Sequence, residues 1–206
     1  MFSNNLSKAV IALLSVAFAT HIAFKFFRKK NRRREINEVI MFSYGAAELK
    51  RSKLSRCMIT KSLDRLLYYL NSPRHSIDIC MYVMTNADLI NAILKLYIRG
   101  IQIRVIIDAD MAFSSGSVLK RLEKQGIPVR WMKSTNLMHH KFCLIDTHTE
   151  DARYTPFVIT GSLNWTNQAL SGNWEDVVVT SQRELVEQYQ IEFERLWLQF
   201  KPIVDM

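Results

Sequence analysis

Cysteine, glycine and proline are scarce in this sequence, and their scarcity argues against several classes of protein. The 206 residues include only 3 Cys, 6 Gly and 4 Pro. Cys57, Cys80 and Cys143 form no C-x-x-C pair, so neither a disulfide framework nor a zinc ribbon is indicated. No glycine-rich phosphate loop and no internal repeat occur. We therefore expect one ordinary hydrophobic core in a reducing compartment, with no metal and no cofactor.

Acidic residues are almost absent from the N-terminal segment. The net charge is +9, and residues 1–35 hold 8 of the 28 basic residues but a single acid, Glu35. Residues 36–206 therefore carry 20 basic and 18 acidic residues and are nearly neutral. The high overall charge describes the N-terminus and does not by itself indicate that the rest of the chain binds nucleic acid.

The N-terminal segment also contains the longest apolar run. Ala9–Phe27 is 19 residues long and mostly apolar, about the length of a membrane-spanning helix. Seven basic residues follow in Lys25–Arg34 and only Lys8 precedes, so the positive-inside rule places the rest of the chain in the cytosol. A cleaved signal peptide, with Ala17–Ala19 as its cleavage site, is the alternative, but the strong charge lies after the apolar core. We predict a membrane anchor, most similar to outer-mitochondrial signal anchors.

After the anchor and basic segment at 1–35, we expect one catalytic domain at 36–206. Apolar residues at helical spacing alternate there with short apolar runs typical of buried strands. The predicted helices are 59–72, 86–99, 117–125 and 181–200, and the predicted strands are 76–84, 101–110, 127–133, 140–146, 155–162 and 174–181. Ser181 and Glu184 form a capping-box pattern for the last helix. The fold class is therefore α/β, with a mixed sheet covered by helices.

The stretch NLMHHKFCLID, residues 136–146, places two histidines and a lysine at the start of a predicted strand. Alternate residues of a strand share a face, so His139 and Lys141 point one way while His140 and Phe142 point the other. A histidine nucleophile beside a fixed cation suits attack on a phosphodiester, because the ammonium neutralises the phosphate oxygens. His139 is thus the candidate nucleophile, and we interpret His140 as structural.

Further polar residues follow in GSLNW. Ser162 and Asn164 are again two apart and offer neutral donors to the same oxygens. Glu175, at the head of a predicted strand, could hold a ring N–H of His139 and select its tautomer.

These residues carry a family resemblance. His139-x-Lys141-x-x-x-x-Asp146, followed by Gly161-Ser162-Leu163-Asn164 and Glu175, resembles the signature of the phospholipase D (HKD) superfamily. The chain is similar to the mitochondrial, Zucchini-type branch of this superfamily over about residues 55–200. The shared features are a single copy of the motif, the sequences MHHKF and GSLNWT, and the N-terminal anchor. The resemblance implies a phospholipase D-like mixed β-sheet flanked by helices and a phosphohistidine intermediate. It implies the following site: catalytic His139, Lys141, Asp146, Asn164 and Glu175, with Asp146 fixing a loop, and substrate-binding Ser162, Lys141 and Asn164.

The same resemblance implies substrates and partners. A metal-independent endoribonuclease that cuts single-stranded RNA for piRNA maturation is expected at the mitochondrial outer membrane, as a homodimer with a shared site. The alternatives are a phospholipase that cleaves cardiolipin to phosphatidic acid and a non-catalytic mitochondrial adaptor. A lipase needs a sizeable apolar pocket, whereas a narrow basic groove favours RNA. Candidate groove residues are Arg56, Lys61, Lys120, Arg121, Lys124 and Lys133, although a solvated helix face explains the group from Lys120 to Lys124 equally well.

Other conspicuous residues receive simpler interpretations. Cys57 stands alone where some animal members of the family carry a small Cys/His zinc site, so we expect no metal there. His75 and His148 lack a neighbouring H-x-K pattern and are interpreted as surface residues. Trp165 and Trp174 flank the motif and could stack a base or a lipid chain. Core packing is the favoured interpretation of both tryptophans.

Overall fold

The computed structural model describes residues 2–30, 35–43, 48–113, 118–151 and 153–202. The chain divides into two compact units, 1–34 and 35–206, which are described separately. The first unit contains α1, Phe2–Lys30, so the segment Ala9–Phe27 is helical as predicted. Its described apolar side chains, such as Leu13 and Phe18, are exposed. Within the described part of the chain, no helix combines the length and the hydropathy of a membrane span.

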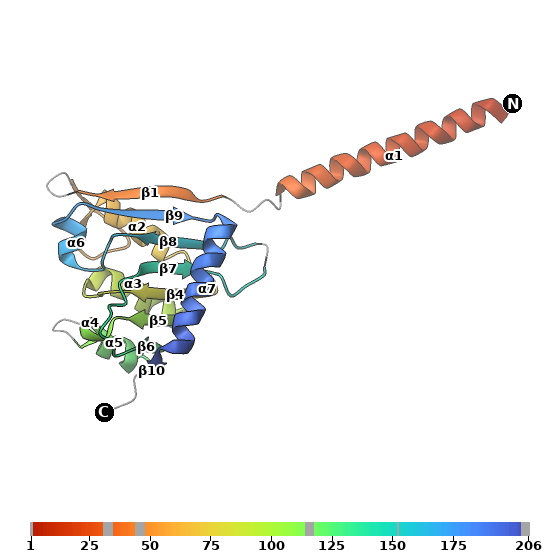
Figure 1. The fold of residues 1–206 in the computed structure, drawn as a ribbon. Coiled ribbons are helices and arrows are strands. Elements are labelled where there is room, and N and C mark those ends of the chain that lie inside the picture. Colours follow the sequence, from red (N-terminus) through yellow and green to blue (C-terminus); the bar gives the residue numbers. More distant parts are fainter. Residues whose placement is uncertain (1, 31–34, 44–47, 114–117, 152, 203–206) are drawn as a thin grey trace. The chain divides into compact units, whose positions relative to one another are not determined.

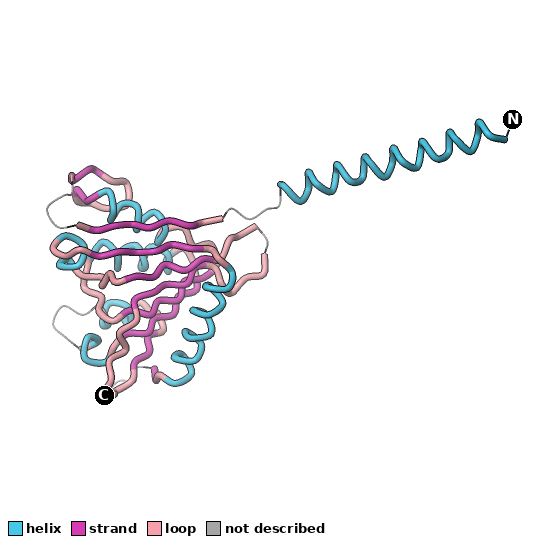
Figure 2. The backbone as a smooth tube through the Cα atoms, turned by 45° about the horizontal axis from the view of Figure 1, so that its top comes forward, coloured by secondary structure: helices cyan, strands magenta, loops and turns pink. Residues whose placement is uncertain are grey.

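The second unit is built on a mixed sheet of eight strands in the order β1-β9-β8-β7-β4-β5-β6-β10 (Figures 1 and 2). The pairs β4–β5 and β5–β6 are parallel, and the other neighbours are antiparallel. A separate two-stranded sheet joins β2 and β3. The strands are β1 Asn37–Phe42, β2 Leu49–Arg51, β3 Met58–Thr60, β4 Ser76–Met81, β5 Gln102–Ile107, β6 Val129–Trp131, β7 Lys141–Ile145, β8 Phe157–Gly161, β9 Glu175–Thr180 and β10 Lys201–Pro202. The predicted α/β class with a mixed sheet is confirmed.

Helices cover both faces of this sheet (Figure 1). They are α2 Lys61–Leu70, α3 Ala87–Ile98, α4 Ala109–Ala112, α5 Leu119–Lys124, α6 Asn167–Ser171 and α7 Arg183–Gln199. Side-chain caps start α2 and α3, where Thr60 and Asn86 accept hydrogen bonds from the backbone N–H groups of Leu63 and Leu89. The predicted helices in these regions are confirmed.

Strand residues divide between two apolar layers. In β7, Cys143 and Ile145 belong to the larger layer shared with α2 and α3. Phe142 and Leu144 point to the opposite face and pack with Phe193 of α7, which is fully buried. This alternation follows from the two-residue period of a strand, and it fixes which side chains of the motif face α7.

Two local predictions need correction. Strand β1 was not predicted, yet it pairs antiparallel with β9 at the edge of the sheet. The predicted capping box at Ser181 and Glu184 is wrong, because Gln182 is the N-cap residue of α7 and makes no side-chain cap. The hydroxyl of Ser181 instead accepts a hydrogen bond from Ile36 N at 2.8 Å. Ser181 therefore ties the segment before β1 to the end of β9.

The strand directions bring several chain segments together along one edge of the sheet, the edge formed by the ends of the strands and not by an edge strand. Because β4 and β5 are parallel, both end at this edge. Strand β7 begins there, since Lys141 is paired with Met81 at the end of β4. Strand β8 ends there and β9 begins there. The loops at this edge, which we call the site edge, are residues 82–86, 134–140, 162–166 and 172–174.

Candidate active site

His139 and Lys141 lie together at the site edge. Lys141 Nζ is 3.2 Å from Nδ1 and 3.3 Å from Nε2 of His139, and it donates a hydrogen bond to the His139 carbonyl at 2.9 Å. The structure therefore places both side chains on one face, as predicted. Because the ammonium is almost equally far from the two ring nitrogens, it does not select one of them as the nucleophile.

The ammonium of Lys141 is partly withdrawn from water. Burial lowers the pKa of Lys141 below its ordinary value, while the negative charge of Glu175 opposes this change. A partly desolvated cation interacts more strongly with an approaching anion than a solvated one. Lys141 is thus suited to holding a phosphate oxygen.

His140 belongs to the other face. Its Nε2 lies 3.2 Å from Oε1 of Glu192 in α7, and its ring contacts Phe142 edge-on at 5.6 Å between centroids. Arg195 holds the same carboxylate at 2.8 Å and is the main cause of the lowered pKa of Glu192. The structure thus connects His140 to α7 and separates it from Lys141.

Glu175 and Ser162 are neighbours at the site edge, but their partners differ from those expected. Ser162 Oγ donates a hydrogen bond to Glu175 Oε2 and accepts one from Asp176 N at 3.1 Å. Asn173 Nδ2 donates to the other oxygen of Glu175 at 2.8 Å. The carboxylate is therefore held by Ser162 and Asn173 rather than by the imidazole of His139.

Asn164 carries an unusual amide. Its Oδ1 is buried and lacks a hydrogen-bond partner in the described structure, whereas its carbonyl accepts a bond from Thr166 N at 2.9 Å. Buried polar atoms normally have a partner, and an amide oxygen accepts hydrogen bonds, so Oδ1 lacks the donor that such an atom normally has.

Asp146 lies away from this group, at the other end of β7. Its carboxylate accepts hydrogen bonds from the backbone N–H groups of Arg74, His75 and Ser76, and it is only 4% exposed. Asp146 also has a left-handed backbone, with φ of 54°. The structure therefore does not bring Asp146 together with His139, and it assigns Asp146 the loop-fixing role that the resemblance implies.

The sequence analysis did not identify two residues that contact the loop carrying His139. The Tyr82 ring lies 4.6 Å from the His139 ring, centroid to centroid, and Lys141 Nζ lies 5.4 Å from the Tyr82 centroid. Asp108 Oδ2 accepts a hydrogen bond from Met138 N at 3.0 Å and so fixes the loop before His139. Each of these residues directly follows a buried strand, β4 or β5. This position could have identified them, because ligand sites gather at such strand ends.

An open groove of about 430 Å³ adjoins His139 between the preceding loop and α7. Its lining is mixed: Met132, Ser134, Asn136, Leu137, Met138, His139, His140, Glu192, Arg195, Leu196, Gln199 and Phe200. None of the predicted basic groove residues is among these. Lys61 pairs with Glu48 and Arg121 donates to Asn91, so these two are engaged on the surface instead. A groove lined by those lysines and arginines therefore stays a prediction.

The two tryptophans that flank the motif differ. Trp165 is 3% exposed and belongs to the core, as expected. Trp174 is 75% exposed, which contradicts the interpretation that it packs in the core. It precedes Glu175 directly, so a large aromatic surface lies at the site edge.

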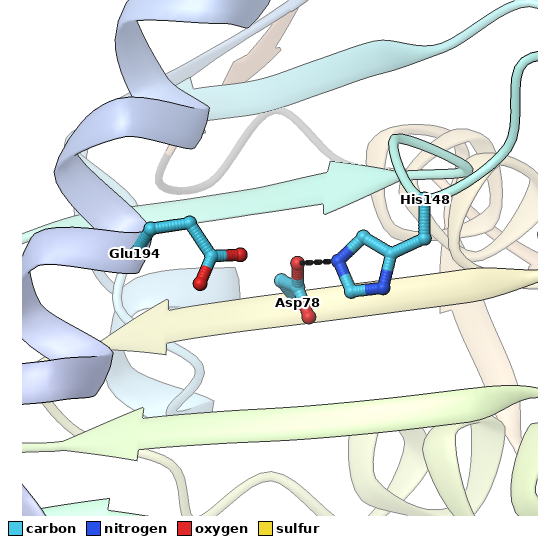
Figure 3. Close-up of side chains that lie close together, drawn as sticks. All are labelled: Asp78, His148 and Glu194. Carbon is cyan, nitrogen blue, oxygen red and sulfur yellow. Dashed lines mark hydrogen bonds and ion pairs between the residues drawn. The ribbon is translucent and has the colours of Figure 1, made fainter.

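A second polar cluster lies beneath α7 (Figure 3). Asp78 of β4 is 1% exposed and binds both Nε and Nη2 of Arg104, at 2.8 and 2.7 Å. His148 Nε2 lies 2.7 Å from the same carboxylate, and Glu194 of α7 receives Arg104 at 2.6 Å. Burial raises the pKa of Asp78, but hydrogen bonds from Arg104 and His148 outweigh this effect, so its pKa is lowered. His148 is therefore part of a cluster and is not the simple surface residue that we expected.

The second cluster has the donor types of a metal site but already contains a cation. Ligand atoms of Asp78, His148 and Glu194 all lie within 4.8 Å of one another. The guanidinium of Arg104 bonds both carboxylates and supplies the positive charge that a metal would bring. We therefore interpret this cluster as structural.

Sequence comparisons agree with this geometry. The family described as "Cardiolipin synthase, PLD-like domain" matches residues 66–197. A protein named mitochondrial cardiolipin hydrolase from Xenopus tropicalis is 34% identical over 202 residues, covering 95% of this chain and 91% of that protein. A human protein of the same name is 40% identical over 141 residues, covering 68% of this chain and 53% of that protein.

Solved structures share the fold. The phospholipase D family member Nuc from Salmonella typhimurium matches with a TM-score of 0.65 and 21% identity, over 84% of this chain and all of that chain. NucT from Helicobacter pylori matches with a TM-score of 0.63 and 20% identity, over 82% of this chain and all of that chain. At these identities the likeness concerns the fold alone.

Proposed function

Because the chain belongs to the phospholipase D-like family and is a phosphodiester hydrolase, we propose that it cleaves its substrate through a phosphohistidine on His139. The contact between Lys141 Nζ and the imidazole at 3.2 Å supports this proposal, since a cation beside an imidazole is the arrangement that attack on a phosphodiester needs. His139→Asn should abolish turnover in the full-length chain. Normal turnover by that variant would contradict the covalent route.

The reaction has two displacements. One ring nitrogen of His139 attacks phosphorus, a P–N bond forms, and the P–O bond breaks with its electron pair going to the leaving oxygen, which is then protonated. Water next attacks phosphorus, the P–N bond breaks, and the free imidazole and a phosphomonoester result. Lys141 holds the non-bridging oxygens, and two neutral donors complete their binding: the amide N–H of Asn164 and the hydroxyl of Ser162, once it turns from Glu175 to the phosphate.

No carboxylate pair of the described site is free to bind a metal for this chemistry, and we propose a metal-independent reaction. Glu175 is bound by Ser162 and Asn173, and Asp146 is bound by backbone N–H groups away from His139. A chelator should leave turnover unchanged. With RNA, attack by the enzyme should give 5′-phosphate and 3′-hydroxyl ends, whereas 2′,3′-cyclic phosphate ends would show attack by the ribose hydroxyl.

Single-stranded RNA is the substrate that we favour, with a role in piRNA maturation at the mitochondrial surface. The groove beside His139 lies on the side of His140 and α7. It is open and lined by both polar and apolar side chains, which suits a flexible strand that leads to His139 better than packed acyl chains. The exposed Trp174 provides a surface on which a base could stack. Labelled single-stranded and duplex RNA should be offered together, and only the single strand should be cut.

Cardiolipin is the second candidate substrate. The relatives from Xenopus tropicalis and human are named mitochondrial cardiolipin hydrolase, and α1 exposes apolar side chains that could hold the protein at a lipid surface. Vesicles that contain cardiolipin should be assayed for release of phosphatidic acid beside the RNA assay. Turnover of cardiolipin without turnover of RNA would make cardiolipin the favoured substrate. Turnover of neither substrate would support the alternative of a non-catalytic adaptor.

Attachment to the mitochondrial outer membrane, with the catalytic domain in the cytosol, is proposed to depend on α1. Its described apolar residues, including Ile11 and Leu14, are 63% and 64% exposed. Fractionation of cells followed by carbonate extraction tests this directly. The full-length chain should stay in the mitochondrial membrane pellet, and release by high salt alone would show that charge rather than α1 holds it.

We also propose that the active form is a homodimer with one shared site. The double displacement needs a second group that protonates the leaving oxygen in the first step and activates water in the second, and His139 of the partner subunit would supply it. If wild-type and His139→Asn chains are unfolded, mixed equally and refolded, about one quarter of the dimers are fully wild-type by random pairing. Activity near one quarter of an all-wild-type sample supports the shared site, and activity near one half means that each chain works alone.

A further inference from the structure

Tyr82 contacts both members of the catalytic pair. Its ring centroid lies 4.6 Å from that of His139 at an interplanar angle of 55°, and 5.4 Å from Lys141 Nζ. The ring therefore packs against the imidazole and also faces the ammonium. We propose that Tyr82 is a positioning residue, whose ring holds the imidazole of His139 in the orientation for attack on phosphorus.

The need for such a residue follows from the other neighbours of His139. Lys141 Nζ lies between 3.2 and 3.3 Å from both ring nitrogens, so it does not fix the orientation of the ring. The carboxylate of Glu175 is engaged with Ser162 and Asn173. A ring held only by Lys141 could turn, whereas an aromatic ring packed against it at a tilted angle limits that rotation.

The backbone holds Tyr82 firmly enough for this role. Tyr82 N donates a hydrogen bond at 2.9 Å to the carbonyl of His140, the residue between the catalytic pair. The next residue, Val83, accepts a bond from Trp165 N at 3.1 Å. Met84 also forms a bridge with Trp165. The segment that carries the ring is therefore tied to both halves of the motif.

Tyr82 also shields the ammonium of Lys141. The titratable groups that face Lys141 are Tyr82 from the end of β4, His139 from the preceding loop and Glu175 from β9. Burial is the main cause of the lowered pKa of Lys141. Removal of the aromatic ring should admit water and return this pKa toward its ordinary value, which a purely structural role elsewhere would not do.

The test compares Tyr82→Leu with Tyr82→Phe in the full-length chain, using bis(p-nitrophenyl) phosphate so that neither RNA nor lipid binding is needed. This inference rests on the proposed role of His139. Tyr82→Leu should lower kcat about 10- to 100-fold, with KM changed less than about twofold, because misplacement affects the reacting geometry more than binding. Tyr82→Phe keeps the ring and should retain at least about half of kcat. In Tyr82→Leu the alkaline fall of activity should move to higher pH.

Tyr68→Leu is the matched control. Tyr68 is also a partly exposed tyrosine that faces a cation, with Arg65 at 4.7 Å, but it lies on α2. The Tyr68→Leu substitution should change kcat less than about twofold. If Tyr82→Leu does not fold by tryptophan fluorescence, Tyr82→Met, which has a long side chain without a ring, replaces it with the same expected fall.

Two outcomes would overturn the positioning role: full kcat in Tyr82→Leu or its replacement, or an equal loss in Tyr82→Phe, which would assign the effect to the hydroxyl. An active His139→Asn chain would instead refute the proposed function itself, so the two failures are distinguishable.

Discussion

Two clusters in this protein combine a histidine, a cation and a carboxylate, and they differ in how completely their charges are matched. In the cluster beneath α7, Arg104 bonds Asp78 and Glu194, and His148 bonds Asp78. At the site edge, His139 is the hydrogen-bond partner of Lys141 among the described residues, and the negative charge of Glu175 acts on Lys141 at longer range. The first arrangement has little left to offer a ligand. The second keeps its cation available for an incoming phosphate.

The place of each cluster in the sheet explains this difference. Asp78 and Arg104 are paired in the middle of parallel strands β4 and β5 and are covered by α7, where an unmatched charge would be costly. His139 precedes β7 and is exposed, so water can solvate its neighbours until a substrate arrives. Stability and reactivity are thus built from similar residues at different depths.

The largest effect should come from the exposed pair, and it should concern activity alone. His139→Asn should lower turnover by about 10⁴-fold or more, because removal of a covalent nucleophile leaves only binding and electrostatic effects. Its unfolding, followed by tryptophan fluorescence in urea, should match that of the wild type. His140→Ala is the control and should keep most of the activity. Reversed results would show that the wrong histidine is assigned.

The buried cluster should respond in the opposite way. Arg104→Met leaves the buried carboxylate of Asp78 without its main partner and should lower the free energy of unfolding by about 3–5 kcal/mol. The double variant Asp78→Leu with Arg104→Met should recover part of this loss, since the buried charge is then absent. Arg195→Met, at an exposed ion pair of α7, is the control and should leave unfolding nearly unchanged. Equal unfolding of Arg104→Met and wild type would contradict the structural role.

His148 should contribute less than Arg104. His148→Gln keeps a polar side chain but weakens the hydrogen bond to Asp78, and we expect a loss of about 1–2 kcal/mol in the free energy of unfolding. Turnover of the folded enzyme should remain normal. A large loss of turnover with unchanged stability would mean that the second cluster takes part in the reaction.

The smallest effect concerns the pH dependence of the exposed pair. The pKa of Lys141 is lowered in the folded protein, so its ammonium is present below that pKa and is lost as the pH rises through it. Activity should therefore fall on the alkaline side at a lower pH than an ordinary lysine would give. Lys141→Arg should have lower maximal turnover but lack this alkaline fall, because arginine stays charged. The same alkaline fall in both proteins would assign it to another group.

The sheet and the main features of the site could be predicted because short-range patterns determine them. Short apolar runs located the central strands, and the two-residue period correctly separated His139 and Lys141 from His140. Strand β1 escaped prediction because its exposed residues Val39 and Met41 are as apolar as its buried residues, so its sequence shows no alternation of polar and apolar side chains. The wrong cap at Ser181 has a similar origin, since a tertiary partner, Ile36, competes for its hydroxyl.

Residues that depend on contacts between distant segments could not be predicted. Asp78 sits within a buried strand, and its pairing with Arg104 becomes visible only from the parallel register of β4 and β5. The contact of Tyr82 with His139 likewise depends on the pairing of β4 with β7. These residues lie close together only because of the strand pairing in the folded sheet, which the sequence pattern alone does not specify.

The two ends of β7 carry different duties, and this has a consequence for insertions and deletions. Lys141 opens the strand at the site edge, and Asp146 follows its last residue and binds the turn at residues 74–76. The four residues between Lys141 and Asp146 therefore set the distance along β7 between the site edge and that turn. One added residue would turn either Lys141 or Asp146 to the opposite face, because successive strand residues alternate. Length changes should thus be tolerated in the loop that follows His148, whereas changes within the strand should inactivate the enzyme or detach Asp146 from that turn.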